Sequence, residues 1–106
     1  MKVEKKDIYI HIVFYNNDST DDLKRKIDLL FSDIENLIID IQSENINKEK
    51  LVLSFLKYST LWKKKNKSFI LVVNDSKIDY DKEIICLPTL NEAVEYLYME
   101  ELERNV

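Results

Sequence analysis

The stretch Leu37-Ile38-Ile39-Asp40-Ile41 decides the fold, together with a similar apolar run at residues 69–73. Each run has the length and composition of an interior strand that is covered on both faces of a sheet. Between them, the amphipathic segment from about Lys48 to Lys64 predicts a helix, with Asn47 as its N-cap. Strands that are joined through a helix need a crossover connection, so we expect these two strands to be parallel.

The flanking segments extend this unit. Residues 8–14 predict a further strand, with one face fully buried and the other, which carries His11, half covered. Ser19 opens a helix through an S-x-x-D pattern, and Thr89 opens the last helix through a T-x-x-E capping box. The inner side of that last helix is predicted to consist of Leu90, Ala93, Val94, Leu97 and Leu102.

The last strand is expected at residues 84–87, after a polar loop at residues 74–83 in which Ile78 and Tyr80 could form an edge segment. We therefore predict one α/β domain over residues 1–106, with a mixed, mostly parallel sheet of four or five strands and three main helices. The sequence leaves open whether the segment around Val3 adds a strand.

Composition excludes several classes of function. The chain has no glycine, which disfavours phosphate-binding loops, dinucleotide-binding fingerprints and the nucleophile elbow of hydrolases. Its net charge of -4 disfavours nonspecific nucleic-acid binding, and its one lysine cluster, at residues 63–67, fits the end of a helix. No apolar run approaches the roughly 20 residues of a membrane span. The charged N-terminus and the single cysteine, Cys86, favour a cytoplasmic protein without a disulfide.

Few side chains suggest catalysis. A single histidine and a single cysteine disfavour a zinc site, so we expect neither a metal nor a cofactor. His11 and Cys86 both lie within predicted strands and are interpreted as structural residues. Asp40 is the exception, because the run that contains it resembles the third strand of a response-regulator receiver, in which such an aspartate would accept phosphate. A receiver also needs paired acids after its first strand and a lysine after its last parallel strand. This chain has Phe14-Tyr15-Asn16-Asn17-Asp18 at the first position, without paired acids, and Leu87-Pro88 at the second.

Residues 37–73, taken with the last strand and helix, resemble a STAS domain, the module of anti-sigma factor antagonists and of sulfate transporter tails. The resemblance rests on the two apolar runs, on Ile46-Asn47 before the helix, on the lysine-rich helix end, and on an Asp40 to Val72 spacing that fits without a gap. The ending from Ile84 to Leu97 is similar to the closing strand and helix of that family. The resemblance covers about residues 8–102 and implies a domain that acts by protein–protein contact.

One element of the family is missing. STAS domains of this kind carry an Asp-Ser-Ser/Thr-Gly element before the central helix, and an anti-sigma kinase phosphorylates its hydroxyl. The matching positions here are Lys48, Glu49, Lys50 and Leu51, which offer neither a hydroxyl nor a glycine. The resemblance therefore implies an anti-sigma factor antagonist-like domain without the phosphoswitch.

The helix start and its outer side resemble a docking surface in this family. Leu53 lies outside the apolar stripe of the predicted helix, which suits a contact residue. We therefore predict a partner-binding site at Asn47, Lys48, Glu49, Lys50 and Leu53. The resemblance implies an anti-sigma factor or a related regulatory kinase as the partner, and a homodimer is a further option. The net charge and the lack of a long apolar run favour neither a nucleic-acid nor a membrane partner.

Two alternatives stay open at this stage. The chain could be a degenerate receiver domain with Asp40 as a vestigial or active phosphoacceptor. It could also be a small enzyme that works through carboxylates, with Asp40 and a loop acid from Asp75 to Asp81, although no spacing supports this beyond the number of acids.

Overall fold

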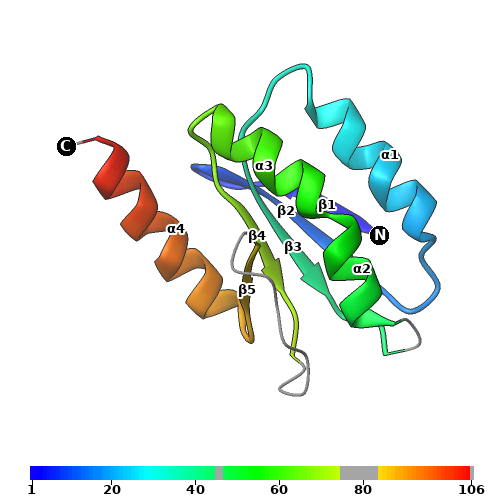
Figure 1. Cartoon of the computed structure of the whole chain (residues 1–106). Helices are drawn as coiled ribbons and strands as arrows, with labels where there is room; N and C mark the ends of the chain where they lie inside the picture. Colours follow the sequence, from blue (N-terminus) through cyan, green and yellow to red (C-terminus); the bar gives the residue numbers. More distant parts are fainter. Residues whose placement is uncertain (45–46, 75–83, 106) are drawn as a thin grey trace.

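The computed structural model describes residues 1–44, 47–74 and 84–105. Its helices and strands, in chain order, are β1 (Lys2–Lys5), β2 (Tyr9–Phe14), α1 (Thr20–Leu30), β3 (Asn36–Ile41), α2 (Lys48–Ser54), α3 (Leu56–Lys64), β4 (Phe69–Val72), β5 (Ile85–Leu87) and α4 (Leu90–Arg104) (Figure 1). This order confirms the predicted α/β class. The edge segment predicted at Ile78 and Tyr80 lies outside the described residues.

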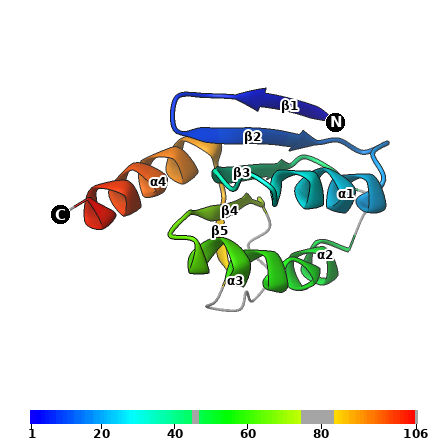
Figure 2. The ribbon, with the colours of Figure 1, turned by 90° about the horizontal axis from the view of Figure 1, so that it is seen from above.

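The strands form one mixed sheet with the order β1-β2-β3-β4-β5. β1 is antiparallel to β2, so the segment around Val3 does add a strand, and the other neighbours are parallel. The steps from β2 to β3 and from β3 to β4 run in one direction across the sheet. Right-handed crossovers in one direction place their helices on the same face. α1, α2 and α3 therefore share one face, and α4 lies on the other (Figure 2).

The face under α1, α2 and α3 carries the larger core. Alternate residues of β2, β3 and β4 point into it, and they meet fully buried side chains of the helices, among them Leu23, Ile27, Phe55 and Trp62. The Tyr58 hydroxyl donates a hydrogen bond of 2.9 Å to the Asp28 carboxylate and so links α3 to α1.

The other face is only partly covered. Ile38, Ile70 and Val72 pack against Ala93 and Leu97 of α4, whose main contacts are with β3, β4 and β5. A single helix is about 10 Å wide, whereas neighbouring strands lie nearly 5 Å apart. One helix therefore covers only part of a sheet of five strands. On this face α4 lies over β3, β4 and β5, and the part formed by β1 and β2 lies beside the helix.

Three predicted caps are confirmed. The side chains of Ser19, Asn47 and Thr89 accept hydrogen bonds from the third residue after each, at the starts of α1, α2 and α4. The lysine cluster also lies where expected, with Lys63 and Lys64 in the last turn of α3.

Two details of the predicted helices are wrong. The helix expected from Lys48 to Lys64 is broken at Phe55 into α2 and α3. At the break, the Ser54 hydroxyl donates a 2.6 Å hydrogen bond to the Leu51 carbonyl, which competes with the helical backbone bonds. Leu102 is 70% exposed rather than on the inner side of α4, because five residues after Leu97 correspond to about 140° around the helix.

A polar network ties the end of α4 to the sheet. The Asn36 amide donates to the Glu101 carboxylate (2.7 Å) and accepts from the Ser68 backbone N–H (2.8 Å). The Ser68 hydroxyl donates to Glu100, and the Arg104 guanidinium donates to Ser68, Asn36 and Glu101. The hydrogen bond from Arg104 is the main cause that lowers the pKa of Glu101, with the Asn36 amide second.

In the described ranges no helix is both long and apolar enough to cross a membrane.

Candidate functional site

The predicted partner-binding residues surround the start of α2. Asn47 is the N-cap, and its side-chain oxygen accepts a 3.0 Å hydrogen bond from the Lys50 backbone N–H. Lys48, Glu49 and Lys50 form the first turn, with Lys48 partly buried and the other two exposed. We call the five residues Asn47, Lys48, Glu49, Lys50 and Leu53 the α2-start surface.

Leu53 completes this surface. Its side chain is 49% exposed, whereas the neighbouring Leu51 and Val52 are buried in the core. Leu53 follows Glu49 by four residues and Lys50 by three, the spacings at which side chains meet on a helix surface. The structure therefore brings an exposed apolar group and two opposite charges together on one side of α2.

A hollow of about 290 Å³ adjoins the α2-start surface and separates it from α1. It is lined by Thr20, Lys24, Asn47, Lys50, Leu51 and Ser54. Its apolar base at Leu51 and its lysine rim could accept a small partner side chain with an acceptor group. Of the predicted site residues, Asn47 and Lys50 therefore line this hollow, whereas Lys48, Glu49 and Leu53 are not part of its lining.

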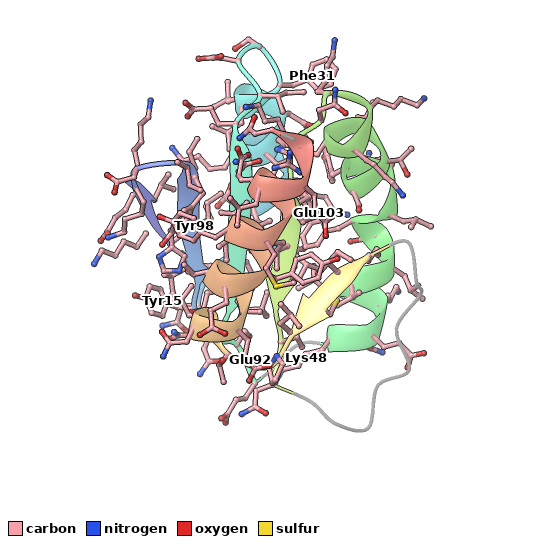
Figure 3. All side chains as sticks on the ribbon, turned by 90° about the vertical axis from the view of Figure 1, so that its left-hand side faces the viewer. Tyr15, Phe31, Lys48, Glu92, Tyr98 and Glu103 are labelled. Atoms are coloured by element: carbon pink, nitrogen blue, oxygen red, sulfur yellow. The ribbon has the colours of Figure 1, made fainter. Side chains whose placement is uncertain are left out.

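A second feature, which the sequence analysis did not assign as a site, is the half of the sheet beside α4. Figure 3 shows α4 in front of the sheet with β1 and β2 next to it, and Tyr98 on the side of α4 that faces them. A hollow of about 380 Å³ lies here, lined by Lys2, Glu4, Lys6, Tyr9, His11, Val13, Tyr15, Asp40, Gln42 and Leu90. We call the residues of β1 and β2 in this set, together with Lys6 and Tyr15, the open sheet face.

His11 and Asp40 lie at the base of this hollow. The Nε2 atom of His11 is 3.9 Å from Oδ2 of Asp40, and Oδ2 accepts a 3.2 Å hydrogen bond from the Gln42 amide. Nε2 is buried and has no hydrogen-bond partner within the described part of the chain. Burial lowers the pKa of His11 below its ordinary 6.5, and the nearby carboxylates of Asp40 and Glu4 oppose that shift only in part. His11 is therefore neutral at pH 7.

This burial predicts a pH-dependent stability. Because the folded-state pKa of His11 lies below the unfolded value, the unfolded chain binds the extra proton first as the pH falls. We expect the free energy of unfolding to be constant above about pH 7 and to fall below pH 6.5, by at most about 1.4 kcal/mol per pH unit. Urea unfolding of wild type and of His11→Gln at pH 7.5, 6.5 and 5.5 measures this dependence of the free energy of unfolding on pH. A decline of equal slope in His11→Gln would show that another group titrates.

Asp40 is buried, and its polar contacts among the described residues are with His11 and Gln42. No group of three or more His, Cys, Asp or Glu side chains in the described ranges could hold a metal ion. The loop acids Asp75 to Asp81, which the carboxylate-enzyme hypothesis invokes, lie outside the described residues. Burial raises the pKa of the Cys86 thiol to about 12, which keeps this half-buried cysteine protonated at neutral pH.

From the sequence, the open sheet face could be inferred only in part, from the alternation of side chains between the two faces of the strand predicted at residues 8–14. Tyr9, His11 and Tyr15 share one face of the second strand, and that face was interpreted as half covered. The contributions of Lys2 and Glu4 could not be inferred, because they depend on β1 pairing antiparallel with β2. No protein-family model matches the chain, and a search of curated proteins found no match.

Proposed function

We propose that this chain is a non-catalytic, STAS-like regulatory domain that acts by binding another protein through the α2-start surface. The observation that carries the proposal is the position of Leu53, an exposed apolar side chain three and four residues after Lys50 and Glu49 on α2. A confirmed α/β architecture with a mostly parallel sheet supports the resemblance on which the partner class depends.

The resemblance suggests an anti-sigma factor or a related regulatory kinase as the partner. The four positions that match the phosphorylated element of that family are Lys48, Glu49, Lys50 and Leu51, and none of them carries a hydroxyl group. Binding at the α2-start surface would then be independent of phosphorylation at these positions. The extent of complex formation would instead depend on the amounts of the domain and of its partner.

The α2-start surface is tested by affinity capture from a lysate of the source cells. The bait proteins are wild type, the Leu53→Asp/Glu49→Lys double variant, and a Leu29→Asp/Asp33→Lys control that makes the same charge change on α1 and in the turn that follows it. Leu29 is 72% exposed, and Asp33 is exposed as well, so the control alters another part of the surface.

We expect wild type and control to retain the same regulatory protein and the double variant to lose it. The captured protein is then purified, and its affinity for the three baits is measured by titration calorimetry, with at least about 30-fold weaker binding expected for the double variant. The melting temperature of the double variant should stay close to that of wild type, since both altered side chains are exposed. Equal retention by all three baits would contradict the proposal.

A further inference from the structure

The hollow between α1 and α2 has charged side chains of one sign in its lining. Its lining consists of Thr20, Lys24, Asn47, Lys50, Leu51 and Ser54. Two of these side chains are basic and none is acidic. On α1 the two lining residues are four apart, and on α2 residues 47, 50, 51 and 54 have the spacing of one helix face. Each helix therefore directs one side toward the hollow, and both helices lie on the same face of the sheet (Figure 2).

Neither lysine is paired with a carboxylate of the domain. The ion pairs within the described ranges include neither Lys24 nor Lys50. The neighbouring acids Asp21 and Glu49 are exposed, lie outside the lining and form no ion pair in the same ranges. Asp28, one turn after Lys24, accepts its hydrogen bond from a tyrosine of α3 instead. The two ammonium groups are therefore available to a negative group from outside the domain.

The hollow has room for a side chain rather than for a whole small-molecule ligand. Its volume of about 290 Å³ corresponds to about ten water molecules, below the range of about 300–1,000 Å³ that small-molecule pockets usually have. Leu51 at its base is buried and belongs to the core under α1, α2 and α3. The Asn47 oxygen already accepts from the Lys50 backbone N–H, and the Ser54 hydroxyl already donates to the Leu51 carbonyl. The charged donors that remain are the two lysine side chains.

An acidic side chain complements this lining. The carboxylate of an aspartate or glutamate accepts charge-assisted hydrogen bonds from ammonium groups, which are about twice as strong as bonds between neutral groups. Its methylene groups would contact the apolar base at Leu51. Leu53 follows Lys50 by three residues on α2, so it offers an apolar contact to a residue beside the acid. A nucleic acid suits the surface less well, because the net charge of the chain is -4 and two lysines neutralise few phosphates.

We propose that the partner of the α2-start surface inserts an aspartate or glutamate side chain into this hollow, where Lys24 and Lys50 bind its carboxylate from two helices. An apolar side chain next to that acid packs on Leu53. The inference rests on the proposed function for the partner being a protein, and it adds the chemistry by which the partner is recognised. It also extends the contact surface to α1, through Lys24, a residue that helical spacing on α2 does not reveal.

Selection of peptides tests the occupant before the partner is known. A phage library of random peptides is first depleted on the Lys24→Glu/Lys50→Glu variant, which removes peptides that bind elsewhere, and is then selected on wild type. Circular dichroism checks that the variant is folded. We expect the recovered peptides to share an aspartate or glutamate next to an apolar residue. Recovery of no peptide, or of peptides without a shared acidic position, would overturn the proposal.

Affinities then locate the contact. A fluorescent form of the selected peptide is titrated by anisotropy against wild type, Lys24→Ala/Lys50→Ala and the control Lys26→Ala/Lys64→Ala, which removes two exposed lysines of α1 and α3 outside the lining. We expect at least about 10-fold weaker binding for the first variant and unchanged binding for the control. A peptide with the amide in place of the acid should bind wild type and Lys24→Ala/Lys50→Ala equally weakly. Equal affinity of the acidic peptide for all three proteins would overturn the proposal, and so would binding of inorganic phosphate without binding of the peptide.

Binding of the purified partner separates this inference from the proposed function. Loss of binding by both Lys24→Glu/Lys50→Glu and Leu53→Asp/Glu49→Lys would support both. Loss by the Leu53 variant alone would overturn the acidic occupant and leave the proposed function in place. Retention by both variants, with acidic peptides still selected by the hollow, would contradict the proposed function and support the hollow as a site for acidic peptides.

Discussion

Replacement of Trp62 by alanine should lower the free energy of unfolding by about 3–5 kcal/mol, a large share of the stability of a domain of this size. Trp62 is fully buried on the face under α3 and packs edge-on against Phe69, with ring centroids 5.4 Å apart. Its indole N–H donates a 2.8 Å hydrogen bond to the Glu35 carbonyl, just before β3. The alanine variant loses apolar burial, ring contacts and this bond together. Urea unfolding followed by circular dichroism measures the loss.

Trp62→Phe separates these contributions. The smaller ring keeps most of the packing against Phe69 but leaves the Glu35 carbonyl without its donor, at an expected loss of about 1–3 kcal/mol. A loss for Trp62→Ala no larger than that for Trp62→Phe would show that the aromatic packing contributes little.

Asn36→Leu should have the second largest effect, a loss of about 3 kcal/mol. Asn36 is 3% exposed, and its side chain pairs with the Ser68 N–H and the Ile8 carbonyl as well as with Glu101. Leucine keeps the branched shape of the side chain but removes all of these bonds, and each buried backbone group left without a partner costs about 1–3 kcal/mol. The same urea measurement on Asn91→Leu, which alters an exposed asparagine of α4, should show a change within about 0.5 kcal/mol. A similarly small change for Asn36→Leu would contradict a stabilising role of the network.

Local signals in the sequence are sufficient to predict most of the helices and strands. Continuous apolar runs predict β3 and β4 because a strand covered on both faces has no polar side, and the caps at Ser19, Asn47 and Thr89 locate three helix starts. The break at Phe55 could not be predicted, since the apolar stripe continues across it and the competing bond comes from Ser54, a residue common in helices.

The two candidate surfaces differ in how far the sequence reveals them. The α2-start surface consists of residues within one short helix and its cap, so helical spacing alone brings Glu49, Lys50 and Leu53 together. The open sheet face depends on the pairing of β1 with β2 and on the placement of α4, which no local pattern specifies. The network of Asn36 and Glu101 likewise joins residues that are 65 positions apart.

Site-specific photo-crosslinking tests the central claim, that a partner docks on the α2-start surface, most directly. Benzoylphenylalanine takes the place of Leu53 in one protein and of Leu29 in a control, and each protein is irradiated in cells and its adducts are identified by mass spectrometry. We predict one abundant adduct to a regulatory protein at position 53 that is absent at position 29. No adduct at position 53, or the same adducts at both positions, would contradict the claim.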